Sequence, residues 1–224
     1  AYAATGISSC HESSQLEEAA EKLRKGISVW IREGSVAKDL KALSPLLTLA
    51  TSTSIGFCTD DRNPLDIANE GHIDFLIRGA IAQGVPAEVA YRAASWSVAR
   101  HYGLTRGAAR TGAIAPGYVA DLVVLGDARS CAVEQVFKSG VAASEIPLPS
   151  LAKARPFGNT VRAVMPEAAD LRGPSGRVHV IGVEHGKIIT SRHVLDHDAP
   201  GVARLTVLER YGKGSKPANA YVTG

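Results

Sequence analysis

The sequence predicts an α/β protein, with a parallel sheet and its covering helices in the first hundred residues and a β-rich remainder. Two observations predict this class. Up to about residue 103, short β-branched runs alternate with amphipathic helical segments, as in the units that build parallel sheets. After residue 110 the helical period ends, and turns rich in Gly and Pro separate short apolar runs.

The helices of the first half are predicted from their end signals and their apolar faces. Ser14 and Glu17 have the spacing of a capping box, and Ser35 is placed to cap a second helix that Pro45 interrupts. Gly103 is expected to end the last helix. In chain order, the predicted helices cover residues 14–26, 35–47, 73–81 and 86–102.

The strands of the first half are short and apolar. Residues 27–31 and 54–58 are rich in β-branched and aromatic side chains, and a short segment before His11 is a third candidate. A barrel of eight strand–helix units takes roughly 250 residues, so about three strands are fewer than half of one. We therefore expect this sequence to be part of a longer chain, and its only Met, at position 165, agrees with that expectation.

The second half is predicted to be β-rich. Residues 141–160 contain three prolines and are interpreted as a connection, and His185-Gly186 is a hairpin signal. Residues 211–216 form a basic, glycine-rich loop without the spacing of a phosphate-binding loop. The predicted strands cover residues 120–125, 133–138, 177–183, 187–190 and 202–208.

Composition excludes several classes of protein. A net charge of +3 is too small to indicate nucleic-acid binding, and no run of apolar residues is long enough to span a membrane. The start of the chain lacks the basic and apolar regions of a secretory signal. Three widely spaced Cys do not form a disulfide framework and favour a reducing compartment. We expect a globular, cytoplasmic protein.

Polar clusters directly follow the three predicted parallel strands, at residues 8–12, 32–35 and 59–62. The carboxyl ends of parallel strands meet at one edge of the sheet, where such folds place their sites. If the strands are neighbours, the side chains that converge there are His11, Arg32, Glu33, Asp60 and Asp61. An imidazole and a carboxylate can together bind a divalent metal, and the carboxylate can take a proton from water.

Structural interpretations of the same residues stay open. His11 with Glu12 is also typical of a solvated loop, and Asp60 with Asp61 is also typical of a helix-capping turn before Pro64. Arg32 and Glu33 are alternatively a surface ion pair, and His72 is alternatively a residue of a helix-leading loop.

The polar motifs resemble those of bacterial-type adenine deaminases, in the amidohydrolase superfamily. They follow that family's order: Ser-Cys-His-Glu (9–12), Ile-Arg-Glu-Gly-Ser (31–35), Phe-Cys-Thr-Asp-Asp-Arg (57–62) and Glu-Gly-His-Ile-Asp (70–74). Residues 112–124 are similar to a segment shared across amidohydrolases, and Glu209-Arg210 with the tail resembles the start of an extra C-terminal domain. The resemblance extends over essentially the whole chain.

The resemblance implies the C-terminal part of a metal-dependent (β/α)8 barrel, a small β-sandwich segment and part of a β-rich C-terminal domain. The implied boundaries are 1–110 for the last barrel strands and helices, 111–145 for the sandwich segment and 158–224 for the C-terminal domain. The chain is then an internal piece, cut before the sixth barrel strand and inside the C-terminal domain.

The resemblance also implies an activity, the hydrolytic deamination of adenine to hypoxanthine and ammonia at a divalent, binuclear metal centre. Manganese or iron is the implied metal, with zinc as an alternative. By position, His11 and Asp60 are the implied metal ligands, and Asp60 is also the catalytic base. Arg32, Glu33, Asp61 and His72 are weaker candidates for contacts to the substrate or support of the ligands.

Part of the family's ligand set has no counterpart in this sequence. No His-x-His occurs in it, and Asn63 stands where the family commonly has His. Two metal-associated groups cannot hold a binuclear centre, so we expect the isolated 224-residue chain to be inactive. The implied partner is adenine, without nucleic acid or membrane, and the full-length protein is a candidate homo-oligomer. Alternatives are an amidohydrolase for another nucleobase or a cyclic amide, and a non-catalytic binding or assembly module.

Overall fold

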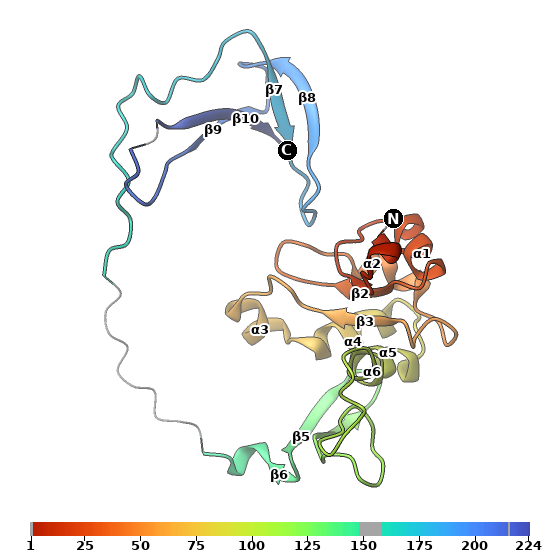
Figure 1. Cartoon of the computed structure of the whole chain (residues 1–224). Coiled ribbons are helices and arrows are strands. Elements are labelled where there is room, and N and C mark those ends of the chain that lie inside the picture. Colours follow the sequence, from red (N-terminus) through yellow and green to blue (C-terminus); the bar gives the residue numbers. More distant parts are fainter. Residues whose placement is uncertain (1, 148–157, 215) are drawn as a thin grey trace. The chain divides into compact units, whose positions relative to one another are not determined.

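The computed structural model describes residues 2–147, 158–214 and 216–224, and the chain divides into two compact units, Ala1–Pro147 and Leu148–Gly224 (Figure 1). The first unit contains a parallel sheet of three strands in the order β1-β2-β3 and an antiparallel sheet in the order β4-β5-β6. The second unit contains a four-stranded sheet in the order β8-β7-β10-β9. The chain is therefore a mixed α/β protein with several sheets, as the sequence predicts.

The parallel sheet has β2 at its centre, between β1 and β3. Its strands are β1 (Ser9–Cys10), β2 (Ser28–Arg32) and β3 (Ile55–Cys58). Alternate side chains of a strand point to opposite faces, so Val29 and Ile31 enter the hydrophobic core together with Ile55 and Phe57. Arg32 belongs to the other face, and it is nevertheless 1% exposed. The sheet thus presents one apolar face and one face with a buried cation.

Six α-helices of the described residues accompany this sheet. They are α1 (Leu16–Arg24), α2 (Leu40–Leu43), α3 (Pro64–Glu70), α4 (Ile73–Ala82), α5 (Ala87–Ala94) and α6 (Trp96–His101). Short 3-10 turns lie at Tyr2–Thr5, Ser44–Leu46 and Ala143–Glu145. Leu43, Leu76 and Val89 are almost fully buried in the core shared with β2 and β3. Burial of this apolar face fixes the strand ends that carry the polar clusters.

Three helix predictions need correction. The capping box is wrong, because Gln15 is the N-cap of α1 and makes no side-chain cap. The second helix begins at Leu40 rather than at Ser35, because the Asp39 N–H binds the Arg32 carbonyl and closes residues 33–38 into a loop. The predicted helix 86–102 is broken at Ser95 into α5 and α6.

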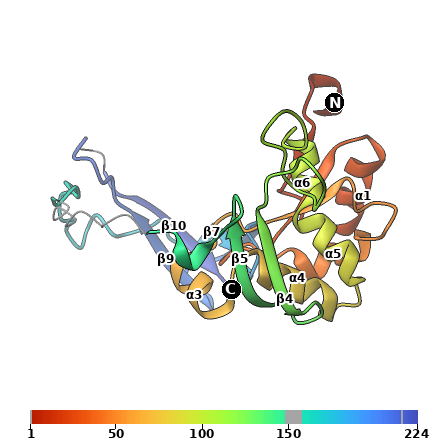
Figure 2. The same cartoon turned by 90° about the horizontal axis from the view of Figure 1, so that it is seen from below.

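The antiparallel sheet of the first unit is a hairpin with a short third strand (Figure 2). Its strands are β4 (Leu122–Asp127), β5 (Ala132–Lys138) and β6 (Val141–Ala142). The turn between β4 and β5 contacts the helices, since the Tyr91 hydroxyl of α5 donates to the Ala128 carbonyl at 2.8 Å and Cys131 is buried in the core. Both predicted strands of this region are confirmed.

The second unit is built from β7 (Arg177–Gly182), β8 (Ser191–Asp196), β9 (Val202–Val207) and β10 (Ala218–Thr223). The hairpin around His185-Gly186 is confirmed, but the predicted strand 187–190 is wrong, because the second strand is Ser191–Asp196. Strand β10 was not predicted, and it pairs with both β7 and β9. Residues 148–157 of the predicted connection lie outside the described residues. Where the chain is described, no helix is long and apolar enough to cross a membrane.

Candidate active site

The carboxyl ends of the three parallel strands bring three predicted site residues together. His11 follows β1, Arg32 is the last residue of β2, and Asp60 lies two residues after β3. The His11 Nε2 lies 3.9 Å from the Asp60 Oδ1, and the Arg32 Nη1 lies 3.6 Å from the Asp60 Oδ2. The prediction that these strand ends converge at one edge is therefore correct for His11, Arg32 and Asp60.

Two further carboxylates complete this cluster. Glu12 accepts a hydrogen bond from the Arg32 Nη1 at 2.9 Å, and its other oxygen lies 3.2 Å from the His11 Nε2. Asp39, at the start of α2, accepts from the Arg32 Nε at 3.1 Å. We call His11, Glu12, Arg32, Asp39 and Asp60 the strand-end cluster.

The strand-end cluster has two buried members, Arg32 and Asp39, and its other three side chains are exposed. The side chains of Arg32 and Asp39 are 1% and 5% exposed, whereas those of His11 and Asp60 are 47% and 40% exposed. Burial alone would lower the pKa of the Arg32 guanidinium, but its contacts with Glu12 and Asp39 outweigh burial and raise that pKa. Arg32 is therefore a permanent cation beneath an accessible imidazole and carboxylate.

The backbone at Asp60 is unusual. Its φ of 45° lies in the left-handed region, which a non-glycine residue seldom occupies and which Asp tolerates better than most. The chain thus turns immediately after β3, and the Asp60 carboxylate lies beside residues of β1 and β2. Backbone conformations of this kind concentrate at functional sites.

Glu33 and Asp61 were predicted at the same edge, but the structure gives both of them other contacts. The Glu33 carboxylate accepts from the Leu40 N–H at 2.9 Å, and burial raises its pKa. The Asp61 carboxylate accepts from the Val36 N–H at 2.9 Å. Both side chains fix the loop between β2 and α2, and the described contacts do not connect them to His11 or Asp60.

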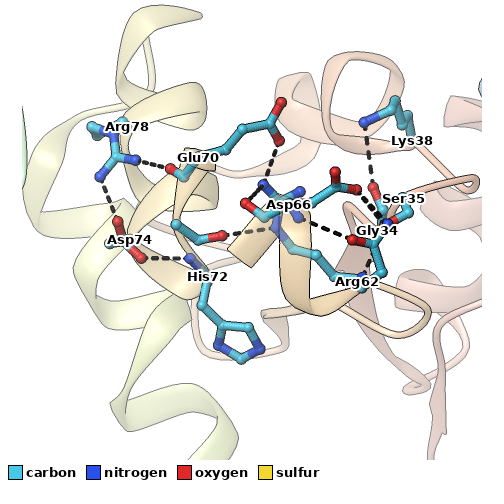
Figure 3. Close-up of polar contacts among 11 residues, drawn as sticks. Gly34, Ser35, Lys38, Arg62, Asp66, Glu70, His72, Asp74 and Arg78 are labelled. Atoms are coloured by element: carbon cyan, nitrogen blue, oxygen red, sulfur yellow. Dashed lines mark hydrogen bonds and ion pairs between the residues drawn. The ribbon is translucent and has the colours of Figure 1, made fainter. Parts of the chain in front are cut away.

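His72 lies at the N-terminus of α4, in a separate polar network that Figure 3 shows. Its N–H donates to Asp74, and its imidazole Nε2 lies 2.9 Å from the Thr59 hydroxyl. In Figure 3 the imidazole projects away from the ion pair of Asp74 with Arg78. Thr59 immediately precedes Asp60, so His72 is next to the strand-end cluster without being part of it.

Two cysteines flank the strand-end cluster. Burial raises the pKa of the Cys58 thiol to about 12, and the Asp60 charge adds to that rise, so the thiol is neutral at physiological pH. Burial would also raise the pKa of Cys10, but hydrogen bonds from the Glu12 N–H and from Lys22 outweigh it and lower that pKa. The Lys22 Nζ lies 3.2 Å from the Cys10 sulfur.

The strand-end cluster has the chemistry of a partial metal site. Three carboxylates surround one guanidinium, so the formal charge is −2 with His11 neutral, and a divalent cation would balance it. His11, Glu12 and Asp60 are the accessible groups of the types that ligate such ions, and His11 and Asp60 are the two predicted from the sequence. Among the described residues, no three His, Cys, Asp or Glu side chains form a complete set of ligands.

Sequence reasoning did not identify Glu12 and Asp39 as members of the cluster. Glu12 had a signal, since it adjoins His11 at the end of a strand. Asp39 had none, because it lies seven positions after Arg32, where a helical residue was expected. Only the loop closure by its N–H brings it back to Arg32.

Comparisons with known proteins find similar sequences along the whole chain. The chain is 48% identical to an adenine deaminase of Methylobacterium nodulans over 227 residues, which is 95% of this chain and 40% of that protein. It is 45% and 43% identical to adenine deaminases of Escherichia coli O157:H7 and Shewanella halifaxensis, across 100% of this chain and 40% of each. The chain thus spans about two fifths of the length of these curated relatives.

The family comparison covers the unit that contains the strand-end cluster. The model of the amidohydrolase family matches residues 3–143, which include both sheets of the first unit. The chain therefore belongs to the amidohydrolase family.

Proposed function

We propose that the full-length protein containing this chain is an adenine deaminase, which converts adenine and water into hypoxanthine and ammonia. The observation that carries the proposal is the approach of His11 to Asp60, 3.9 Å apart at the ends of parallel strands and above the Arg32 cation. The choice of adenine as the substrate rests on relatives named adenine deaminase, which are 43–48% identical to this chain.

In this proposal His11 and Asp60 would be two of the ligands of a divalent metal, and such an ion would supply a water nucleophile at neutral pH. Asp60 accepts a proton from the attacking water and passes it to the departing amino group. The Asp60 carboxylate is 40% exposed, so both the water molecule and the amino group can reach it. The Arg32 Nη1 lies 3.6 Å from the Asp60 Oδ2 and fixes the position of that carboxylate by charge attraction.

We further infer that β1, β2 and β3 are the sixth to eighth strands of a (β/α)8 barrel. Their parallel pairing in chain order, with helices in the connections, supports this assignment. In the same assignment, β4–β6 belong to the β-sandwich segment at 111–145, and residues 158–224 begin the C-terminal domain. The other metal ligands then come from strands that this chain does not include.

The test is turnover by the purified full-length protein. We expect ammonia release from adenine, loss of activity after chelation, and recovery with Mn²⁺, Fe²⁺ or Zn²⁺, which also ranks the three metals. A panel of other purines and cyclic amides measured in parallel tests substrate choice. Turnover of one of these with none of adenine would reject the adenine assignment while retaining the family chemistry.

The isolated 224-residue chain provides a second test. Among its described residues no group of three or more His, Cys, Asp or Glu could hold a metal ion, and a binuclear site needs more than the two proposed ligands. We expect no adenine turnover and no stoichiometric metal in the isolated chain. Measured turnover with bound metal would contradict both this expectation and the barrel assignment.

A further inference from the structure

We propose that Asp39 is a positioning residue, which acts through Arg32 to hold Asp60 and Glu12 beside His11 and thereby sets the metal affinity of the site. The inference rests on the proposed function, because it takes His11 and Asp60 as metal ligands. It adds a residue that lies 28 positions after His11 and touches neither of the proposed ligands.

Asp39 contacts Arg32 through both its backbone and its side chain. Its N–H donates to the Arg32 carbonyl at 2.9 Å, which fixes the position of Asp39 against the end of β2. Its Oδ2 accepts from the Arg32 Nε at 3.1 Å and also lies 3.1 Å from the Nη2. The two residues are 4% and 1% exposed, so water does not compete for these contacts.

This clamp determines where the rest of the guanidinium points. The group is planar, so the hydrogen bond at the Nε, with the Asp39 charge also close to the Nη2, restricts the direction of the Nη1. That nitrogen lies 2.9 Å from the Glu12 Oε2 and 3.6 Å from the Asp60 Oδ2. Without Asp39, the long Arg32 side chain would regain rotamer freedom, and both acidic partners would lose a fixed cation.

The two carboxylates in turn flank the imidazole. The Glu12 Oε1 and the Asp60 Oδ1 lie 3.2 and 3.9 Å from the His11 Nε2. Metal affinity depends on the residues that orient the ligands as well as on the ligands themselves. The chain of contacts from Asp39 through Arg32 therefore reaches the carboxylates that flank His11.

If Asp39 had a purely structural role and only compensated a buried charge, its replacement would leave the Mn²⁺ affinity of the folded protein unchanged. The same chain contains a matched control for that role. Arg62 is also buried, at 7% exposure, and it pairs with Glu70 in a network that the described contacts do not connect to His11. Glu70→Gln therefore removes a carboxylate from a buried arginine away from the ligands.

The experiment measures Mn²⁺ affinity of the full-length protein by chelator competition, with the folded state checked by circular dichroism. For Asp39→Asn we expect Mn²⁺ affinity about 10–100-fold weaker than wild type, which is the range typical of residues that orient ligands. At saturating Mn²⁺ we expect the KM for adenine to change less than kcat. For Glu70→Gln we expect Mn²⁺ affinity within about threefold of wild type, because that carboxylate does not orient a ligand.

Folded Asp39→Asn with Mn²⁺ affinity within about threefold of wild type would overturn the inference, since orienting residues have the larger effect. If that variant does not fold, the pair Arg32→Met with Asp39→Asn removes both buried charges and is expected to fold with the same loss of affinity. Wild-type affinity in the folded pair would overturn the inference as well. If the wild-type protein does not turn over adenine but Asp39→Asn still weakens Mn²⁺ binding, adenine is rejected as the substrate and the role of Asp39 is retained.

Discussion

Two buried arginines of the first unit, Arg32 and Arg62, differ in what surrounds them. Arg32 contacts three carboxylates, from the segment after β1, the start of α2 and the turn after β3. Arg62 contacts one carboxylate, that of Glu70 (Figure 3). It also contacts the backbone carbonyl of Gly71 and the ring of Phe75. Both guanidinium groups are nearly inaccessible to water.

We interpret the surroundings of Arg32 as a functional site and those of Arg62 as a structural support. The single charge of Arg62 is balanced by one carboxylate, that of Glu70, within the same short segment. Arg32 contacts more carboxylates than its single charge can balance. Two of them, those of Glu12 and Asp60, are exposed to solvent beside the His11 imidazole. In the proposed function, the surplus of acidic partners around Arg32 is where the metal would bind.

The largest expected effect tests the two adjacent aspartates. Asp60→Asn in the full-length protein removes the charge that faces His11 and Arg32, and we expect adenine turnover to fall about 10³-fold, the scale of a lost acid–base group. Asp61→Asn keeps an oxygen for the Val36 N–H, and we expect it to lower turnover less than about tenfold. Steady-state kinetics at saturating metal measure both. Equal losses in the two variants would place Asp61 in the chemistry.

The next largest effect is a loss of stability on replacing Arg62. Arg62→Met leaves the Gly71 carbonyl without its donor, at 2.8 Å in the native protein, and removes a cation 4.3 Å from the centre of the Phe75 ring. We expect the free energy of unfolding to fall by about 2–4 kcal/mol from these two losses. Urea unfolding of the full-length protein measures it. Mn²⁺ affinity of the folded variant should be unchanged, and a tenfold loss would show that the two arginines are not functionally separate.

Much of the fold follows from local signals in the sequence. The runs 27–31 and 54–58 are found within one residue of β2 and β3, because β-branched side chains on a buried face leave few alternatives. The convergence of His11, Arg32 and Asp60 follows from the rule that parallel strands end at one edge. These features depend on patterns a few residues long.

The remainder depends on contacts between distant residues. The loop before α2 is closed by the Asp39 N–H on the Arg32 carbonyl, and this tertiary hydrogen bond overrides the helical signal at Ser35. After β3, the helix cap predicted at Asp60 and Asp61 is wrong, because the cap of α3 is Asn63. Asn63 caps α3 by accepting from the Asp66 N–H, while Asp60 faces His11. No periodicity distinguishes these roles.

The smallest expected effect is a pH-dependent one in the structural region. The Asp74 carboxylate accepts from the His72 N–H at 2.7 Å and pairs with Arg78 at 2.6 Å. Burial alone would raise its pKa, but these two contacts outweigh burial and hold the pKa below its ordinary value of 3.8. Because the folded pKa is depressed, the stabilisation is fully present above about pH 4 and is lost as the pH falls through the folded pKa.

Asp74→Ala should therefore lower the free energy of unfolding by about 1 kcal/mol at neutral pH, as expected for a charge and hydrogen bond at a helix N-terminus. Urea unfolding of wild type and variant between pH 7 and pH 3 should show a constant difference that narrows only below about pH 4. A gap that widens in acid would contradict the assigned contacts. Unchanged Mn²⁺ affinity in this variant would place Asp74 with Arg62, in the part of the molecule that supports the fold, because the described contacts give neither residue a connection to His11 or Asp60.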